Sequence, residues 1–255
     1  MMAKDRLEII YEDDHILLAN KPPGLLSIPD RFDPHKPNLA GMLNQRYGKV
    51  WVVHRLDRET SGLLVFARDE EAHRHLSQQF ELRQTNKVYL ALLDGQLPQA
   101  EGTIENRLAE NPAKPGRMMV AKKGKLAITH YRLLESFRQF CLAEARIETG
   151  RMHQIRVHFE SIGHPLAIDS LYGRREALFL SAIKQRGFHL GAQEEERPLM
   201  SRITLHAWRL ELEHPATGQH LAFEAPLPKD FAALLKQLRK WGGEGERIKL
   251  REVGG

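Results

Sequence analysis

The segment HRLDRETSGLL, residues 54–64, places one carboxylate, Asp57, between the guanidinium groups of Arg55 and Arg58. Nearby positive charge favours the ionised form of a carboxyl group, which suits a nucleophile or an electrostatic stabiliser. The alternative is a structural ion pair in a turn, because such pairs also perturb carboxylates. The segment by itself leaves both interpretations open.

A second group of basic and hydrogen-bonding residues occurs in TGRMHQIRVH, residues 149–158. Arg151 lies at the N-terminal edge of a predicted helix and Arg156 lies more than a turn further on. Free backbone N–H groups at a helix N-terminus, together with an adjacent arginine, favour anion binding. The alternative is a helix start whose arginine pairs with Glu160 or another acid.

Positive charge is concentrated in one stretch of the chain. The formal net charge is +5, which favours a polyanionic partner. No acidic residue occurs between Glu110 and Glu135. The alternative is a solvated hairpin or loop, since blocks of like charge are often exposed faces. The basic residues in this stretch are Lys114, Arg117, Lys122, Lys123, Lys125 and Arg132.

Histidine and cysteine chemistry is less favoured. His153, His158, His164 and Asp169 could be combined as metal ligands, but His153 and His158 are five positions apart and fall on different helix faces. Zinc ligands occur as closer, facing pairs. The single cysteine, Cys141, excludes intrachain disulfides and a multi-thiolate site. We therefore expect no metal.

The elements that must position these residues are mostly strands. Short alternating apolar runs bounded by turn residues predict strands, and apolar residues at helical spacing predict a few helices. Without regular strand–helix alternation, this pattern favours an α+β fold with mixed or antiparallel sheets. The predictions include strands at 7–11 and 16–20, a Thr-Ser-Gly turn at 60–62 followed by a strand, helices at 70–83, 151–163 and 176–184, a hairpin at 203–226 and a final helix with Phe231, Leu234, Leu235, Leu238 and Trp241 on one face.

Length and composition indicate a reducing compartment. The chain has 255 residues and one cysteine, and no apolar run approaches the roughly 20 residues that a membrane span needs. We therefore predict a cytoplasmic protein without membrane contact. Residues 174–202 are predicted to form a surface excursion and residues 242–255 a flexible tail.

HRLDRETSGLLVFA resembles the signature of the RluA-type RNA pseudouridine synthases, H-R-L-D-x-x-T-S-G followed by an apolar strand. Four further segments resemble motifs of that family in the same order. They are LANKPPGLLSIPDR, KVYLALLDG, TGRMHQIRVHFESIGHPLAIDSLYG and ITLHAWRLELEHPATG. The matches extend over most of the chain, so the resemblance is specific.

The resemblance implies a fold and an activity. The expected fold is α+β, a mixed, mostly antiparallel sheet core with flanking helices and a central catalytic cleft. The expected organisation is a single catalytic domain over residues 1–241, without a separate S4-like module, acting as a monomer. The expected reaction converts specific uridines of ribosomal or transfer RNA to pseudouridine. Because the product is an isomer of the substrate, we expect no cofactor and no metal.

The resemblance also assigns catalytic residues. Asp57 matches the catalytic aspartate, for which attack on uracil C6, attack on ribose C1′ and a glycal route are the alternatives. Tyr89 matches the tyrosine that stacks on the uracil and serves in proton removal from ribose C2′. Arg156 matches the arginine that pairs with the aspartate.

RNA contacts are expected at further positions. Arg55 matches a residue that enters the RNA stack where the uridine has left it, and Leu205 matches an apolar pocket wall. Arg151 and the basic stretch add phosphate contacts. The predicted substrate-binding residues are Arg55, Arg151, Leu205, Lys122, Lys123 and Lys125.

Two rival functions belong to other classes. One is a non-catalytic RNA-binding protein on the same fold, against which the combination of Asp57, Tyr89 and Arg156 argues. The other is a metal-dependent nuclease or phosphoesterase that uses the histidines. The two rivals differ from an isomerase in whether RNA is changed and whether metal is required.

Overall fold

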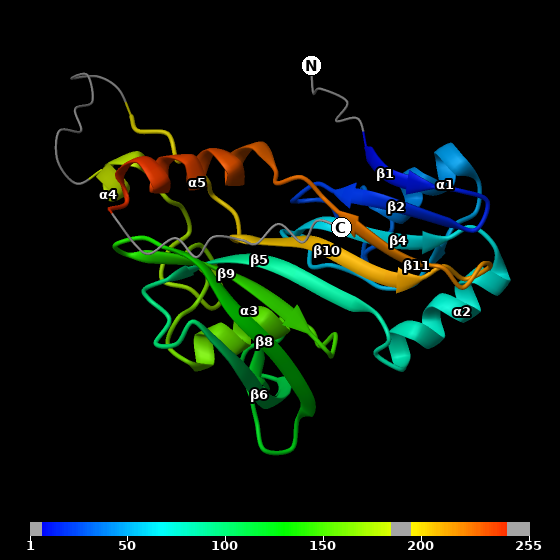
Figure 1. The fold of residues 1–255 in the computed structure, drawn as a ribbon, viewed down its shortest axis with the longest axis horizontal. Coiled ribbons are helices and arrows are strands. Elements are labelled where there is room, and N and C mark those ends of the chain that lie inside the picture. Colours follow the sequence, from blue (N-terminus) through cyan, green and yellow to red (C-terminus); the bar gives the residue numbers. More distant parts are fainter. Residues whose placement is uncertain (1–6, 185–194, 244–255) are drawn as a thin grey trace. The chain divides into compact units, whose positions relative to one another are not determined.

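The computed structural model describes residues 7–184 and 195–243. The chain divides into two compact units (Figure 1). Unit 1 comprises Met1–Val88 and His206–Leu227, and unit 2 comprises Tyr89–Leu205 and Pro228–Gly255. Unit 1 is therefore built from one long N-terminal segment and from a hairpin, His206–Leu227, that comes later in the sequence.

Unit 1 is a sheet with two helices. Its strands follow the order β1-β2-β4-β10, with β11 on β10 and β3 on β4. All of these pairs are antiparallel except β4 with β10, which is parallel, so the sheet is mixed. The elements are β1 Glu8–Glu12, β2 Ile16–Lys21, α1 Leu39–Tyr47, β3 Trp51–Val52, β4 Ser61–Ala67, α2 Glu70–Glu81, β10 Leu205–Glu213 and β11 His220–Glu224.

The core of unit 1 lies between its sheet and α2. β4 is buried along its whole length because it pairs with strands on both edges and its sequence, SGLLVFA, is mostly apolar. Helix α2 adds Ala72 and Leu76, which are four positions apart and therefore face the same side. Asp69 caps the helix by accepting a hydrogen bond from the Ala72 N–H at 2.8 Å. This core fixes the strand that follows the Asp57 segment.

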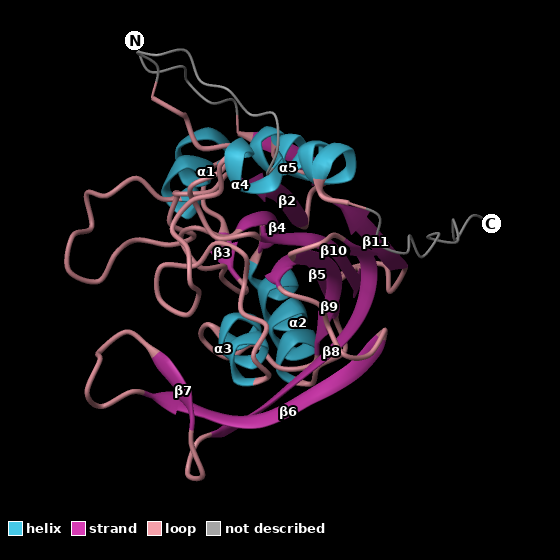
Figure 2. Ribbon diagram, turned by 90° about the vertical axis from the view of Figure 1, so that its left-hand side faces the viewer, coloured by secondary structure: helices cyan, strands magenta, loops and turns pink. Residues whose placement is uncertain are grey.

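Unit 2 also combines strands with helices. β9, β8, β6 and β7 pair antiparallel in that order, and β5 lies next to β9. Helix α3 lies against β6 and β8, with Val157 packed on Leu108 and Ala127 (Figure 2). The elements are β5 Asn86–Asp94, β6 Glu101–Glu110, β7 Met118–Val120, β8 Lys125–Ser136, β9 Phe140–Ile147, α3 Gln154–Ser161, α4 Leu180–Lys184 and α5 Lys229–Trp241.

The expected fold class is confirmed, as a mixed sheet with flanking helices. The predicted hairpin at 203–226 forms β10 and β11, and the final helix buries Phe231, Leu234, Leu235 and Leu238. Trp241 was predicted on that buried face and is instead 37% exposed, because it is the last residue of α5.

Three boundaries differ from the predictions. The predicted turn at 60–62 is wrong, because Ser61 and Gly62 already belong to β4 and the turn lies at residues 58–59. The helix expected at 151–163 begins at Gln154, and the one expected at 176–184 spans only Leu180–Lys184.

Some predictions fall partly outside the described residues. Residues 185–194 of the expected surface excursion and residues 244–255 of the expected tail lie outside the described residues. The single catalytic domain over residues 1–241 stays a prediction. In the described part of the chain, no helix is both long and apolar enough to cross a membrane.

Candidate active site

Asp57 lies in an irregular segment that leads into β4. The Thr60 N–H donates to the Asp57 carbonyl at 3.1 Å and closes a tight turn over residues 58–59. Asp57 is partly buried, whereas Leu56 before it and Thr60 after it are buried. The carboxylate is thus carried by a short turn between two buried anchor points.

Lys21, the last residue of β2, is hydrogen-bonded to the turn that follows Asp57. Its side chain is fully buried. Its ammonium group donates to the backbone carbonyls of Pro22 at 3.0 Å, Leu25 at 2.7 Å and Arg58 at 2.8 Å. Three acceptors match the three donors of an ammonium group, which makes complete burial of the charge tolerable. The lysine joins the KPPG segment to the residue that follows Asp57.

Further hydrogen bonds join the same two segments on both sides of Asp57. The Gly24 N–H donates to the Arg58 carbonyl at 2.9 Å, and Arg58 Nε donates to the Gly24 carbonyl at 3.0 Å. The Leu56 N–H donates to Ser27 Oγ at 3.0 Å, and that hydroxyl donates to the Leu56 carbonyl at 2.8 Å. Residues 21–27 therefore clamp the backbone before and after Asp57.

The two arginines beside Asp57 have different environments. Arg55 is exposed. Arg58 is also exposed, but its Nε takes part in the clamp and lies 3.6 Å from the Glu59 carboxylate. The role of Arg55 in the RNA stack stays a prediction.

Gly62 occupies a position where only glycine fits without strain. Its φ is +116°, and an added Cβ would lie 2.1 Å from the Ala207 carbonyl oxygen. The close approach belongs to the parallel pairing of β4 with β10. Beside it, Ser61 Oγ and Nδ1 of the buried His206 are 3.0 Å apart. The Thr-Ser-Gly residues thus serve strand pairing directly after the Asp57 turn.

His54 is a neutral packing residue. Its ring stacks on Phe80 with centroids 4.5 Å apart, and its Nε2 accepts the Val65 N–H at 3.3 Å. Burial, and to a lesser degree the charge of Lys87, lowers the pKa of His54 to about 3. The imidazole therefore stays uncharged at neutral pH.

In unit 2, Arg156 projects from α3 into a buried ion pair. Its Nε and Nη2 donate to Asp169 Oδ2 and Oδ1, both at 2.7 Å. The side chains of Arg156 and Asp169 are 7% and 0% exposed. Sequence reasoning missed Asp169 as the partner, although it stands in the same matched segment as Arg156. The predicted pairing of Arg156 with Asp57 remains a prediction.

The start of α3 is organised by Gln154. Its Oε1 accepts from the Thr149 hydroxyl at 2.6 Å and from the Arg151 N–H at 3.1 Å, and its Nε2 donates to the Ile128 carbonyl at 2.9 Å. His153 precedes the helix with φ +53°, in the left-handed region. The motif residues Thr149 and Gln154 therefore fix where α3 begins and join it to β8.

Arg151 is held by the backbone of β8. Its Nε donates to the Leu126 carbonyl at 3.0 Å, and it is partly buried. Glu160, considered as its acidic partner, lies 3.5 Å from Arg117. A phosphate contact by Arg151 stays a prediction.

Tyr89 and Leu205 are both buried in unit 2. Tyr89 lies on β5 and is 8% exposed, and Leu205 is the first residue of β10 and is 4% exposed. Such burial fits an apolar wall. Their contact with a uracil ring stays a prediction.

The basic stretch forms β7, a tight turn and the start of β8. The turn is closed by the Gly124 N–H, which donates to the Ala121 carbonyl at 2.9 Å. Lys122, Lys123 and Lys125 are exposed there. Figure 2 shows β7 and the long strand β6 beside it. β7 and β8 both pair antiparallel with β6, so the turn at residues 121–124 connects two strands that run in the same direction and is not a hairpin turn. The exposure of its lysines fits a solvated loop, and contact of these lysines with RNA stays a prediction.

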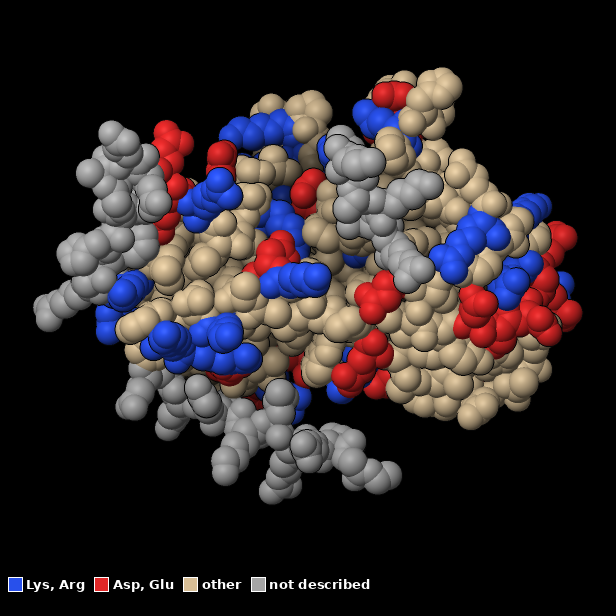
Figure 3. All heavy atoms as spheres, turned by 90° about the horizontal axis from the view of Figure 1, so that it is seen from above, with Lys and Arg blue, Asp and Glu red and all other residues tan. Residues whose placement is uncertain are grey.

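Other parts of the basic stretch have acidic partners. Arg132 lies 2.9 Å from Glu144 on the neighbouring strand, and Arg117 lies near Glu160. The face drawn in Figure 3 likewise carries Lys and Arg side chains mixed with Asp and Glu. Positive charge is therefore not spread evenly over this face. Lys122, Lys123 and Lys125 are better candidates for phosphate contacts than Arg117 and Arg132, which already lie near acidic groups.

Two of the three histidines considered as metal ligands have other hydrogen-bond partners. His153 Nδ1 lies 2.9 Å from the Tyr172 hydroxyl, and His158 Nδ1 lies 2.9 Å from Thr129 Oγ1. Asp169 is the partner of Arg156. Within residues 7–184 and 195–243, no group of three or more His, Cys, Asp or Glu side chains could hold a metal ion.

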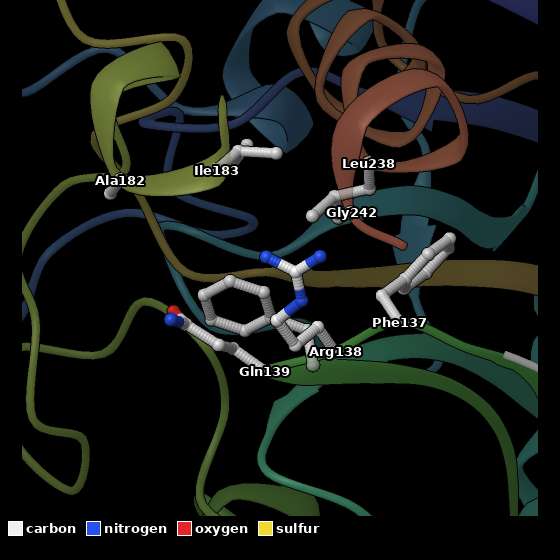
Figure 4. Close-up of a pocket in the computed structure, with 8 residues that line it drawn as sticks. Phe137, Arg138, Gln139, Ala182, Ile183, Leu238 and Gly242 are labelled. Carbon is white, nitrogen blue, oxygen red and sulfur yellow. The ribbon is translucent and has the colours of Figure 1, made fainter. Parts of the chain in front are cut away.

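A small pocket elsewhere in unit 2 contains none of the predicted site residues. It is lined by Phe137, Phe140, Ile183 and Leu238, with the Arg138 side chain across it (Figure 4). The lining is largely apolar and lies between β9, α4 and α5. We assign no catalytic role to it.

Comparisons with known proteins agree on one family. The sequence model of the family described as RNA pseudouridylate synthase matches residues 15–161. A protein named ribosomal large subunit pseudouridine synthase D from Nitrosomonas europaea is 41% identical over 238 residues, covering 91% of this chain and 65% of that relative. A protein of the same name from Pseudomonas aeruginosa is 39% identical, covering 94% of this chain and 74% of that relative. The chain thus spans slightly less than two thirds of the first of these relatives.

Solved structures give the same result. Human RNA Pseudouridylate Synthase Domain Containing 4 aligns with a TM-score of 0.70 at 25% identity, covering 91% of this chain and 92% of that one. Human RNA Pseudouridylate Synthase Domain Containing 1 aligns with a TM-score of 0.66 at 26% identity, covering 92% and 95%. The predicted RluA-type resemblance is confirmed. The chain belongs to the RNA pseudouridylate synthase family.

Proposed function

We propose that the protein is an RNA pseudouridine synthase that isomerises specific uridines in structured RNA. The observation that carries the proposal is the clamped turn that presents Asp57 within the region matched by the family model. A carboxylate fixed by hydrogen bonds on both flanking backbone segments is preorganised for attack or for charge stabilisation. A turn that only connected strands would not need a buried lysine to hold it.

The reaction needs no exchange of atoms with a second substrate. The N1–C1′ bond of uridine breaks, the base turns, and a C5–C1′ bond forms. A proton leaves C5 and N1 gains one, so electrons and atoms balance without an oxidant or reductant. Attack of Asp57 on uracil C6, attack on ribose C1′, and a glycal route remain the alternatives for the carboxylate.

Two further residues complete the proposed chemistry. Tyr89 holds the detached uracil by stacking and serves in proton removal from ribose C2′. Arg156 pairs with the catalytic aspartate, Asp57. Both assignments rest on the matched motifs, and the burial of Tyr89 supports its role as a wall.

The proposed substrate is ribosomal RNA, because the curated relatives are named for the large ribosomal subunit. Transfer RNA is the second candidate. The target base must leave its stack at a cost of a few kcal/mol, which is least in a loop. Arg55, Arg151, Leu205 and the lysines of the basic turn would contact the RNA. We further propose that the protein acts as a monomer in the cytoplasm.

The test uses the full chain and RNA transcripts that carry 5-tritiated uridine, in buffer with EDTA. Pseudouridine formation releases the C5 tritium, so the proposal predicts tritium release from ribosomal or transfer RNA with intact strands. Binding without release would favour the non-catalytic rival. Strand cleavage that requires added divalent metal would favour the nuclease.

A further inference from the structure

We propose that Asp169 and Tyr172 are positioning residues that hold the Arg156 guanidinium in one orientation and tie it to β7, which lies in the basic stretch between Glu110 and Glu135. The inference rests on the proposed function, since it assigns Arg156 to the reaction. It concerns residues of unit 2 alone. Neither Asp169 nor Tyr172 was among the predicted site residues.

Asp169 fixes the plane of the guanidinium group. It takes the Nε–Nη2 edge of Arg156 in a bidentate pair, with both N–O distances 2.7 Å. A planar fork held at two donors cannot rotate, and its Nη1 group points away from Asp169. A lone hydrogen bond would leave the side chain free to turn.

Asp169 is itself held by the backbone that follows it. Its Oδ1 accepts the N–H groups of Leu171 at 2.9 Å and Tyr172 at 3.1 Å. The Gly173 N–H donates to the Asp169 carbonyl at 2.8 Å, and a Cβ on Gly173 would lie 2.7 Å from that oxygen. This turn predetermines the carboxylate's position, so that the buried pair has the good geometry that offsets its desolvation cost.

Tyr172 covers the arginine and reaches a second element. The centroid of its ring lies 4.9 Å from the Cζ of Arg156 and 4.9 Å from the Cζ of Arg117. Both distances are within the range of a cation–π attraction. The ring is 5% exposed, so these contacts are shielded from water.

The Tyr172 hydroxyl connects three structural elements. It accepts the Met118 N–H at 2.7 Å and lies 2.9 Å from Nδ1 of His153, which precedes α3. Met118 is the first residue of β7, and the turn that follows β7 exposes Lys122 and Lys123. The hydroxyl therefore joins the arginine's surroundings to the segment proposed to meet RNA phosphates.

The chain offers close controls for a purely structural role. Arg202 and Asp230 form the same bidentate pair in unit 2, with N–O distances of 2.7 Å. Tyr131 is a second buried tyrosine of unit 2, in ring contact with Phe159. Losing these groups should cost stability of a similar kind without affecting Arg156.

The first variant is Asp169→Asn. Asparagine keeps an oxygen for the turn N–H groups but turns an NH₂ donor towards an Arg156 donor, so it disturbs orientation more than the turn. We expect the single-turnover rate at saturating RNA to fall by about 10²-fold, the scale of a small misplacement, while RNA affinity changes by less than about threefold. Asp230→Asn should lower the melting temperature and leave the rate within about threefold of wild type.

The second variant, Tyr172→Phe, keeps the ring and removes the hydroxyl, and it carries the test if Asp169→Asn does not fold. We expect its rate to fall by about tenfold, or about 1.4 kcal/mol in the barrier, with Tyr131→Phe unchanged. Rates within threefold of wild type for both Asp169→Asn and Tyr172→Phe would overturn the inference.

A readout that does not need activity separates this inference from the proposed function. Hydrogen exchange of the Arg156 Nε–H, identified by its loss in Arg156→Lys, should be slow in wild type and at least tenfold faster in Asp169→Asn. It should be unchanged in Asp230→Asn. A wild-type chain without isomerase activity would reject the proposed function, and unaltered Nε–H exchange in Asp169→Asn would reject the positioning of Arg156 by Asp169.

Discussion

Lys21 is a charged residue whose hydrogen bonds support the backbone of a distant segment. Its ammonium group is fully buried and donates to the carbonyls of Pro22, Leu25 and Arg58. Two of these acceptors come from the turn after β2, and the third follows Asp57. The lysine thus links the KPPG segment, residues 21–24, to the backbone next to Asp57.

We predict that Lys21→Met destabilises the protein strongly. Methionine fills the space but removes the ammonium donor from the carbonyl oxygens of Pro22 and Leu25, at about 1–3 kcal/mol for each. The expected loss in the free energy of unfolding is about 3 kcal/mol or more, measured by urea denaturation. Lys36→Met, which removes an exposed lysine 3.5 Å from Asp30, should change stability by less than about 0.5 kcal/mol. Equal urea midpoints for the two variants would contradict the proposed clamp.

At the scale of residues, motif resemblance identifies candidates but not their supports. Asp57 and Arg156 could be named from their motifs. Lys21 could not, because KPPG predicts only a break in the chain. The Arg156–Asp169 pair was also missed, because the sequence does not reveal which of several acids a fold buries beside an arginine.

At the scale of elements, the sequence located the basic stretch between Glu110 and Glu135 but could not predict how its strands pair. The run without acids was compatible with a solvated hairpin or loop or with a phosphate-binding segment, and the turn at Lys122 and Lys123 is exposed. Which residue lies opposite Arg132 on the neighbouring strand, here Glu144, depends on the register of strand pairing. Register is set by pairing across the sheet, which the local pattern of the run does not contain.

We predict that Lys122→Gln, Lys123→Gln and Lys125→Gln together weaken the salt dependence of RNA binding. Each lost phosphate contact reduces the slope of log K against log salt by about 0.7–0.9, so the slope should fall by about 2–3. Binding is measured across salt concentrations by fluorescence anisotropy. The matched control replaces Lys229, Lys236 and Lys240, three exposed lysines of α5 in the same unit. An equal change of slope in both triple variants would mean that Lys122, Lys123 and Lys125 belong to a solvated surface without specific RNA contacts.

Element boundaries depended on side chains that local periodicity does not reveal. The helix with Arg156 begins three residues later than predicted, because Gln154 uses its side chain to hold the preceding residues and His153 adopts a left-handed conformation. The expected Thr-Ser-Gly turn is a strand start because Gly62 admits the close approach of Ala207. Apolar periodicity was sufficient for α2 and α5, whose buried faces match the predicted spacing.

At the scale of the whole molecule, each unit contains a histidine that folding keeps neutral. Burial lowers the pKa of His54 to about 3 and that of His158 to about 4. In the unfolded chain both would titrate near the ordinary value of about 6.5. The unfolded state therefore binds more protons below that pH, and stability is lost as the pH falls from about 6.5.

We predict that His54→Gln reduces this loss. Glutamine can still accept the Val65 N–H but does not titrate, so the slope of unfolding free energy between pH 6 and pH 4 should decrease by up to about 1.4 kcal/mol per pH unit. Urea denaturation at several pH values measures it. His220→Gln removes an exposed histidine, 72% exposed, and should leave the slope as in wild type. A slope in His54→Gln identical to that of wild type would show that His54 is protonated in the folded state.

The fold class was predictable because strand and helix patterns are local, and the resemblance covered most of the chain. The division into two units was not, because it depends on which distant segments pair. The clearest case is β10 and β11, which follow unit 2 in sequence and yet belong to unit 1. Only long-range pairing such as that of Ala207 with Gly62 determines this placement.

The most direct test of the account is Asp57→Asn in single-turnover assays with 5-tritiated uridine in ribosomal RNA. Asparagine keeps the size of the side chain and removes the charge, so the RNA dissociation constant should stay within about threefold, while tritium release should fall by at least about 10³-fold. Asp14→Asn, which changes an exposed aspartate of the same unit, should release tritium at the wild-type rate. Tritium release by Asp57→Asn at a rate close to wild type would contradict an Asp57-dependent isomerase.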